Sequence, residues 1–269
     1  MNKLDNALYE IYYLDTLAQR DQWVNKLHPL VKFIITIIYI ITLVSFAKYD
    51  VLGVLGMGCY PLLVFNLAQL SFTECLWRLR LVLPLVAMVG LANPLFDHNA
   101  VTVAGYSFSA GWLSMVTLML KGIFAVLASY LLIATTSVER LCYALRQLHV
   151  PKLIVTQLLL TYRYITLLLR QAETISQAYA LRAPKQKGIH FKVWGSLTGQ
   201  LLLRSMDRAT ALYESMTLRG FQGVFYYNGE HAPANKRDWY YLAFMLALIA
   251  ILKYVPILNL ALRCWGGKL

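Results

Sequence analysis

The sequence predicts an all-α integral membrane protein with about five transmembrane helices and long amphipathic helices in one basic segment between the fourth and the fifth. Its composition is 59% hydrophobic and only 14% charged, whereas about a quarter of the residues in a typical soluble domain are charged. Several apolar stretches approach the roughly 20 residues that an α-helix needs to cross a bilayer. Most of the positive charge lies between two of these stretches. Together these observations favour a helical membrane protein over a soluble domain.

Five apolar stretches are predicted to span the membrane. The first has one charge, Lys32, near its start, and the second has none. The third contains Pro84 and Pro94, which a membrane helix tolerates where neighbouring groups satisfy the freed backbone atoms. The fourth contains Lys121, which either has a function, pairs with Asp97, or extends its ammonium group toward the membrane surface. The predicted spans are residues 30–47, 51–72, 81–96, 112–135 and 239–258.

The distribution of positive charge predicts the orientation. Residues 136–237 hold 14 of the 25 lysines and arginines against five acidic residues, a net charge of +9 in a chain of +12. Positively charged loops stay in the cytoplasm, so this segment is predicted to be cytoplasmic. The connection 97–111 has no lysine or arginine and is predicted to be external. This orientation places the N-terminus inside and the C-terminus outside.

The chain is accordingly divided into a membrane region with four spans (1–135), a cytoplasmic helical region (136–237), and the last span with its tail (238–269). Apolar residues spaced 3.6 apart predict the cytoplasmic helices. One helix, 151–182, begins with a proline and stops before Pro184. Another, 191–219, ends at Gly220, because glycine is preferred just beyond a helix end. A shorter helix, 137–148, opens with Ser137, which can cap it.

The sequence lacks the motifs of an enzyme. No G-x-x-x-x-G-K-[ST] phosphate loop occurs, so the chain is not expected to hydrolyse ATP by itself. No pair of carboxylates and no nucleophile with a nearby base stands out. The four cysteines and five histidines are scattered and form no metal-binding pattern. We therefore expect a non-catalytic protein without a metal site, a cofactor or a nucleic acid partner, which contacts lipid and other proteins.

The most informative feature is an internal repeat. Residues 171–183 read QAETISQAYALRA and residues 208–220 read RATALYESMTLRG. Each ends a predicted long helix with leucine, arginine and a small residue. One arginine in a last helical turn can simply complement the helix dipole. Two in matching context favour a second interpretation, in which exposed guanidinium groups bind acidic grooves on a partner. The residues concerned are Leu181, Arg182 and Ala183 in the first copy, and Leu218, Arg219 and Gly220 in the second.

A pair of glycines marks the second long helix. Gly195 and Gly199 form a G-x-x-x-G pattern. Small residues at this spacing let two helices approach closely. The pattern therefore predicts that the two long cytoplasmic helices cross at these glycines.

Four segments resemble one family, the transmembrane T component of energy-coupling factor (ECF) importers of vitamins and metals, in its cobalt-type, CbiQ-like branch. Residues 27–32, LHPLVK, resemble its leucine, Asp-Pro, lysine pattern, with His28 in place of aspartate. Residues 135–139 with 148–151 resemble the stretch that opens its coupling region, and 161–165, TYRYI, resemble its arginine-tyrosine signature. The repeat resembles its paired Ala-Arg-Gly motifs, although both alanines are leucine here and Ala183 replaces the first glycine.

The resemblance implies a scaffold that transmits energy. In this family, two cytoplasmic ABC ATPases close on ATP and their grooves hold the ends of two coupling helices. The motion passes to a separate membrane subunit that binds the substrate, here cobalt or another metal or vitamin. The resemblance also implies a multi-pass protein of the bacterial cytoplasmic (inner) membrane. It assigns the ATPase contacts to the six residues of the two Leu-Arg-small endings.

Two other classes of protein were weighed. The membrane domain of a conventional ABC permease would contact its ATPase through a shorter coupling helix and would line its own substrate path with polar residues. The two long basic helices with matching ends favour the T component over that alternative. A membrane enzyme is disfavoured because the sequence offers no catalytic residues.

Overall fold

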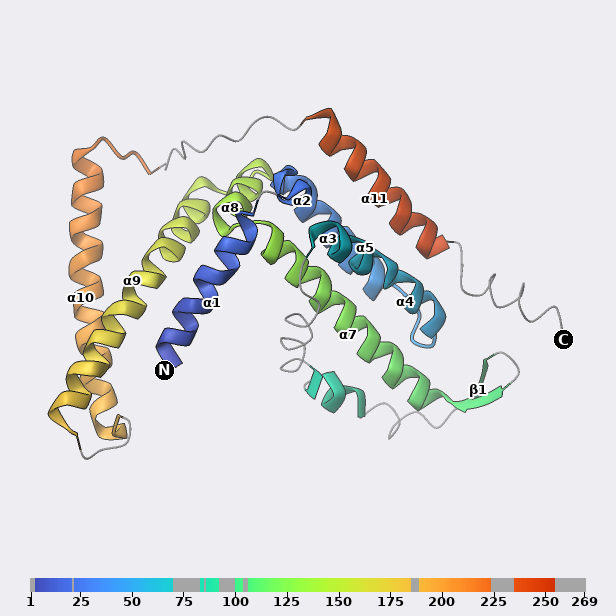
Figure 1. Ribbon diagram of the computed structural model, residues 1–269, viewed down its shortest axis with the longest axis horizontal. Coiled ribbons are helices and arrows are strands. Elements are labelled where there is room, and N and C mark those ends of the chain that lie inside the picture. Colours follow the sequence, from blue (N-terminus) through green and yellow to red (C-terminus); the bar gives the residue numbers. More distant parts are fainter. Residues whose placement is uncertain are drawn as a thin grey trace. The chain divides into compact units, whose positions relative to one another are not determined.

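Helices account for most of the computed structural model, which describes residues 3–20, 22–69, 83–84, 86–91, 100–103, 106–184, 189–223 and 235–254. The predicted all-α class is confirmed. One small antiparallel hairpin, β1 (Ala100–Val103) and β2 (Tyr106–Ser109), accompanies the helices and was not predicted. The chain divides into two compact units (Figure 1). The first unit comprises residues 1–16 and 138–231, and the second comprises residues 17–137 and 232–269.

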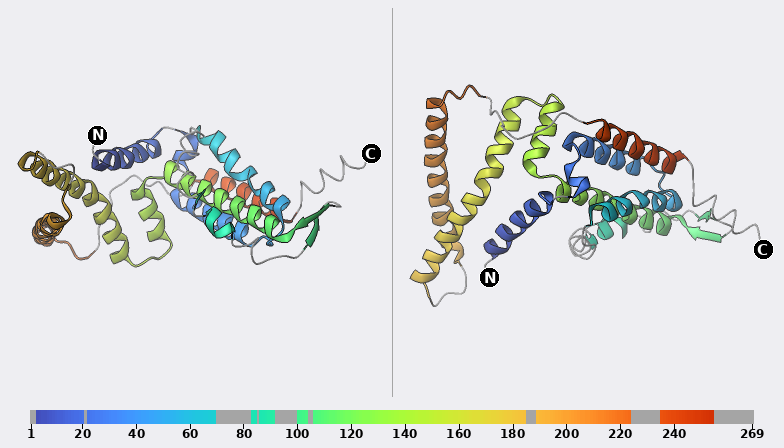
Figure 2. Two further views of the ribbon diagram at one scale, coloured as in Figure 1. Left: turned by 90° about the horizontal axis from the view of Figure 1, so that it is seen from below. Right: turned by 45° about the horizontal axis from the view of Figure 1, so that its top comes forward.

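The second unit is a bundle of apolar helices. It contains α2 (Trp23–Lys26), α3 (Pro29–Val44), α4 (Val51–Met57), α5 (Cys59–Ala68), α7 (Ala110–Thr135) and α11 (Lys236–Tyr254). Residues 83–84 and 86–91 are also helical. Helix α3 packs against α7 and α11, and α4 and α5 pack against α7 (Figure 2).

Burial follows the apolar faces of this bundle. Ile35, Tyr39, Leu43 and Met57 are at most 1% exposed and form its centre. The outward faces are also apolar, because Ile41, Val44, Leu62 and Phe244 are each more than half exposed. Lipid would cover these outward apolar side chains in a membrane.

Helices coincide in position with four of the five predicted spans. By length and composition, three helical stretches in the described residues could cross a membrane: Val51–Ala68, Ala110–Thr135 and Lys152–Arg182. The last of these, α9, was predicted to be cytoplasmic. Helix α3 is apolar but shorter, with 16 residues, and α11 occupies most of the fifth predicted span. Half of the third predicted span, 81–96, lies outside the described residues.

The second predicted span, 51–72, is not one continuous helix. It breaks at Gly58 between α4 and α5. Pro61 explains the break, because it has no N–H to donate to the carbonyl of Met57 and its ring crowds that carbonyl. The Tyr39 hydroxyl donates to Met57 O instead, at 3.1 Å. A side chain at Gly58 would lie 2.7 Å from the Phe124 ring, so α7 approaches closely at this point.

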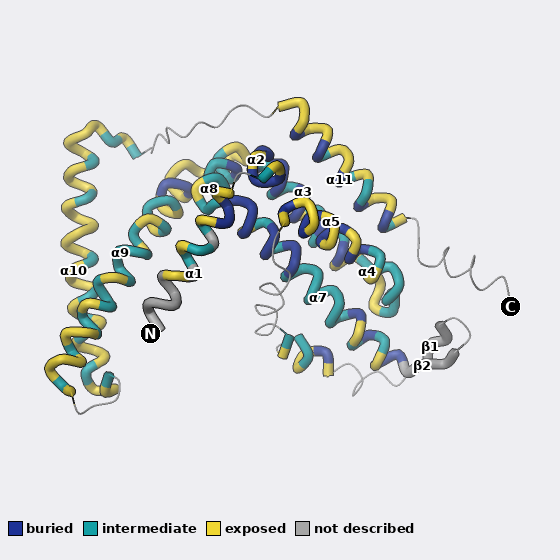
Figure 3. The backbone as a smooth tube through the Cα atoms, viewed as in Figure 1, coloured by how far each residue is buried: buried dark blue, intermediate teal, exposed yellow. Residues whose placement is uncertain are grey.

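The first unit contains the basic region. Its helices are α8 (Val138–Gln147), α9 (Lys152–Arg182) and α10 (Phe191–Leu218), together with most of α1 (Lys3–Ala18). The predicted helices 137–148, 151–182 and 191–219 are confirmed to within one residue at each end. Helices α8 and α10 both contact α9. Helix α10 has no buried residue, and Figure 3 shows its mostly exposed surface.

Candidate functional site at two helix ends

The first predicted contact lies at the end of α9. Arg182 is the last helical residue, and the N–H of Ala183 donates to Tyr179 O at 3.0 Å. Ala183 has φ −127°, which any residue can adopt. Pro184 follows and cannot continue the helix. The side chain of Leu181 is 83% exposed, and Arg182 is also exposed.

The second predicted contact ends α10 differently. Gly220 has φ +82°, in the left-handed region that favours glycine. Its N–H donates to Thr217 O at 3.0 Å, and the N–H of Phe221 donates to Met216 O at 2.9 Å. These two bonds are the Schellman pattern of helix ends. The predicted role of Gly220 in closing the helix is confirmed.

Both Leu-Arg pairs are exposed at their helix ends. Leu218 is 89% exposed and Arg219 is exposed, as at the end of α9. Within the described part of the chain, no hydrogen bond or ion pair engages the guanidinium group of Arg182 or Arg219. Each helix end therefore presents a planar donor group beside an apolar side chain. The same geometry suits both the helix-dipole interpretation and a contact with a partner's carboxylate.

The glycine pair does not form the predicted crossing within this chain. A Cβ atom added at Gly195 or Gly199 would meet no atom of the described residues within 4 Å. Helices α9 and α10 are in contact, and the residues of α10 from Ser205 onward line a groove beside α9. Small residues permit a close crossing but do not by themselves attract a helix.

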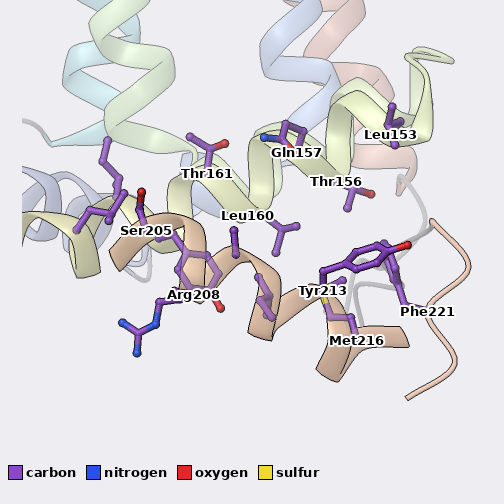
Figure 4. A pocket seen from close by; sticks show the side chains of 15 residues that line it. Leu153, Thr156, Gln157, Leu160, Thr161, Ser205, Arg208, Tyr213, Met216 and Phe221 are labelled. Atoms are coloured by element: carbon purple, nitrogen blue, oxygen red, sulfur yellow. The ribbon is translucent and has the colours of Figure 1, made fainter. Parts of the chain in front are cut away.

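An apolar groove between α9 and α10 was missed by the sequence analysis. It has a volume of about 520 Å³ and lies within the first unit (Figure 4). Leu153, Leu160 and Ile165 line it from α9, and Leu212, Met216 and Tyr213 line it from α10. Arg208 lies at its border. The 3.6-residue spacing along both helices was the available signal, but pairing the two faces required the structure.

Two lysines inside the second unit bind helix ends. Lys32 is 6% exposed, and its Nζ donates to Thr135 O at 2.7 Å, at the end of α7. Lys121 Nζ donates to Val44 O at 3.2 Å and to Phe46 O at 2.7 Å, at the end of α3. Both satisfy carbonyls that a helix leaves without an internal partner. The suggested partner of Lys121, Asp97, lies outside the described residues.

His28 takes part in the packing at the start of α3. Its Nδ1 accepts a hydrogen bond from the N–H of Leu30 at 3.3 Å, so the imidazole caps the helix. An aspartate would offer an acceptor in the same place. The N–H of His28 donates to Asp238 Oδ1 at 3.3 Å, which joins α3 to the first turn of α11. This capping role explains how histidine fits where the resemblance expects aspartate.

No group of three or more histidine, cysteine, aspartate or glutamate side chains able to hold a metal ion occurs in the described residues. Of the four cysteines, Cys59 is exposed and Cys142 is buried, and both are free thiols. The arrangement therefore presents a bundle of apolar helices, two exposed helix ends and a groove.

Comparison with known proteins defines the family. The family model "CbiQ: Cobalt transport protein" matches residues 20–229. The cobalt transport protein CbiQ of Salmonella typhimurium is 24% identical over 230 residues, which covers 79% of this chain and 98% of that protein. The nickel permease LarQ of Lactiplantibacillus plantarum is 30% identical over 121 residues, which is 45% of this chain and less than half (43%) of LarQ. The chain belongs to the CbiQ family and is a membrane component of a transporter.

Proposed function

We propose that this chain is the transmembrane scaffold and energy-coupling component of an ECF-type importer in the bacterial cytoplasmic membrane. The observation that supports this most is the pair of exposed Leu-Arg ends on α9 and α10. A protein that only spans the membrane has no need for two matching ends of this kind. Two matching helix ends suit a partner that contains two similar grooves. A dimer of ATPases has this symmetry, because each subunit contributes one groove.

Each ATPase is proposed to hold one helix end. The guanidinium group would bind a carboxylate with two parallel hydrogen bonds, and the neighbouring leucine would enter an apolar part of the same groove. Fully burying one leucine contributes about 1.5–3 kcal/mol. A hydrogen bond to a charged group contributes about 1.5–3 kcal/mol more. Each helix end would therefore bind its ATPase tightly. When the ATPases close, the force would be divided between the two helix ends.

The coupling helices would pass the motion on. Arg182 and Arg219 end the two helices that contact each other along the apolar groove. A displacement of the arginine-bearing end of α9 or of α10 would therefore change how the two helices pack against each other. We propose that a separate membrane subunit, which binds the substrate, responds to this change. The names of the two relatives make cobalt or nickel the proposed cargo.

The conventional permease is the weaker alternative. It would engage its ATPase through a short coupling helix, whereas α9 and α10 have 31 and 28 residues and separate exposed ends. The permease reading also requires a substrate path within this chain itself.

Purification of the chain with its natural partners tests the proposal. The tagged chain would be isolated from bacterial membranes in mild detergent, and the bound proteins would be identified by mass spectrometry. We expect ATPase subunits and a second membrane protein, and we expect ATP hydrolysis only when the ATPases are present. Transport of Co²⁺ or Ni²⁺ into vesicles by the pure chain, or ATP hydrolysis by it, would contradict the proposal.

A further inference from the structure

The groove between α9 and α10 has a size and a chemistry that the proposed function does not use. All of its lining residues belong to the first unit, so its shape does not depend on the membrane bundle. Along α9 it extends from Leu153 to Leu168, which is about 22 Å at about 1.5 Å per helical residue. Divided by this length of about 22 Å, its volume of about 520 Å³ gives a mean cross-section of about 24 Å².

This cross-section decides what kind of partner the groove can take in. An α-helix with its side chains is about 10–12 Å across, which corresponds to a cross-section of roughly 80–110 Å². A helix of another protein would therefore lie over the groove and not inside it. A single unbranched hydrocarbon chain is much thinner and fits. The hydrocarbon core of a bilayer is about 30 Å thick, so a lipid chain of one leaflet spans about 15 Å, which is less than the length of the groove.

The groove is apolar along most of its length and basic toward one end. Of its 15 lining residues, Arg208 is the one with a charged side chain. Figure 4 shows the guanidinium group pointing away from the lining, toward the end of the groove where Ser205 and Thr161 lie, whereas Met216 and Phe221 lie toward the other end. Within the described residues, no hydrogen bond or ion pair engages this guanidinium group. A narrow apolar groove with one cation at its border fits an amphiphile that has a hydrocarbon chain and an anionic head.

The character of α9 indicates that the bilayer is the source of this amphiphile. Helix α9 is one of three stretches in the described residues that are long and apolar enough to cross a membrane. The segment 136–237, which contains α9 and α10, holds 14 lysines and arginines against five acidic residues. Basic segments at the cytoplasmic face attract anionic lipids, and basic pockets between helices bind their head groups.

We propose that the groove binds an anionic phospholipid, with one acyl chain along the apolar lining and the phosphate group at Arg208. The chain contacts α9 and α10 at once, so its burial stabilises the contact between the two helices. The inference goes beyond the proposed function, because it requires neither the ATPases nor the substrate.

Native mass spectrometry of the full chain, delipidated in mild detergent, tests the proposal. The probes are palmitoyl-oleoyl phosphatidylglycerol, phosphatidylcholine with the same chains, dihexanoyl phosphatidylglycerol and inorganic phosphate. They separate recognition of the head group from recognition of the chain. Hydrogen exchange at the amides of residues 153–168 and 205–216, measured with and without each probe, locates the bound molecule.

Three variants accompany the wild type. Arg208→Gln removes the cation, and Ala209→Phe fills the groove from α10. Lys192→Gln is the control, because it removes an exposed positive charge of the same helix that does not line the groove. If Ala209→Phe disturbs the fold, its hydrogen exchange without lipid will show this, and the comparison of Arg208→Gln with Lys192→Gln then decides.

We expect the wild type to bind palmitoyl-oleoyl phosphatidylglycerol about tenfold more tightly than the phosphatidylcholine, the factor that one hydrogen bond to a charged group brings. Exchange should slow in both helix segments. Arg208→Gln should bind the two lipids equally, Ala209→Phe should bind both weakly, and Lys192→Gln should behave as wild type.

Equal affinity of the wild type and Arg208→Gln for phosphatidylglycerol, or an equal loss in Lys192→Gln, would overturn the proposal. Binding of inorganic phosphate or of the dihexanoyl lipid as tightly as the long-chain lipid would also overturn it, because the site would then recognise an anion alone. So would slower exchange only outside the two segments. A dimer of the chain that Ala209→Phe disrupts would show that a second copy covers the groove, and this too would overturn the proposal.

Discussion

Arg182 and Arg219 are followed by backbones of different conformation. Ala183 has φ −127°, whereas Gly220 has φ +82°. A side chain in the left-handed region crowds the following carbonyl, and only glycine avoids this cost. This accounts for the alanine that replaces glycine in the first copy of the repeat. The two helix ends therefore present similar side chains on different turns.

Exchanging the small residues tests this difference. Gly220→Ala should destabilise the last turn of α10 by about 1–2 kcal/mol, because alanine is strained at positive φ. Ala183→Gly should cost only a few tenths of a kcal/mol, because the backbone there requires no glycine. Hydrogen exchange at the amides of Gly220 and Phe221, compared with the turn after Arg182, measures both effects. Equal effects at the two ends would contradict the assigned conformations.

At the residue scale, the sequence predicted the backbone role of a residue better than it predicted the atoms that a side chain contacts. Gly220 was predicted correctly, because its role depends on local backbone geometry. The partners of Lys32 and Lys121 are carbonyl groups at the ends of other helices, 103 and at least 75 residues away. Backbone carbonyls occur at every residue, so no sequence pattern identifies which ones a lysine will reach. The capping role of His28 could have been inferred from Pro29, which commonly occupies the first position of a helix.

The break between α4 and α5 is the main departure at the scale of elements. The run of apolar residues from Val51 onward predicted one helix, and the combination of Gly58 and Pro61 was the signal against it. Within a bilayer, each carbonyl without a hydrogen bond is costly. The Tyr39 hydroxyl supplies the bond that Pro61 cannot, and its ring stacks on Tyr60 with centroids 4.4 Å apart.

A double-mutant cycle tests this compensation. Tyr39→Phe keeps the stacked ring but removes the donor, so it should destabilise the protein by about 0.6 kcal/mol, the average for interhelical hydrogen bonds in a membrane protein, and by no more than about 1.7 kcal/mol. Pro61→Ala restores an N–H that can reach Met57 O. In that background the cost of Tyr39→Phe should become small. Thermal unfolding in detergent measures all four proteins, and additive effects would show that the two donors do not serve the same carbonyl.

For the long helices α9 and α10, the sequence predicted the ends correctly but did not predict how the two helices pack. The ends of α9 and α10 were predicted correctly from Pro151, Pro184 and Gly220, because helix-breaking residues act on the local backbone. The contact between the two helices was predicted at Gly195 and Gly199, but a Cβ atom added at either glycine would meet no atom of the described residues within 4 Å. Which part of a helix pairs depends on the summed packing of many side chains. A motif of two glycines involves too few side chains to determine that packing.

At the scale of the whole molecule, orientation in the membrane remains a prediction from charge. In a chain without its four native cysteines, Ser107→Cys should react with a membrane-impermeant thiol reagent added outside intact cells. Gln186→Cys should react only after the membrane is opened, because the basic region 136–237 is predicted to be cytoplasmic. The reverse pattern would contradict the predicted orientation. Gln186 lies outside the described residues, and the labelling result does not depend on its local structure.

The central claim is that two helix-end arginines, rather than bulk positive charge, hold the ATPases. Arg182→Glu with Arg219→Glu places like charges opposite both proposed acidic grooves. Disrupting one buried charge pair typically costs about 2–5 kcal/mol, so losing both should release the ATPases. Lys185→Glu with Lys187→Glu changes the net charge by the same amount close to Arg182 in the sequence and serves as the control.

The decisive measurement is the amount of ATPase that co-purifies with each variant, together with uptake of the cargo by cells that express it. The account predicts that the arginine double variant loses the ATPases and uptake, while the lysine variant keeps both. Normal ATPase binding and uptake in the arginine double variant, or an equal loss in the lysine variant, would contradict it.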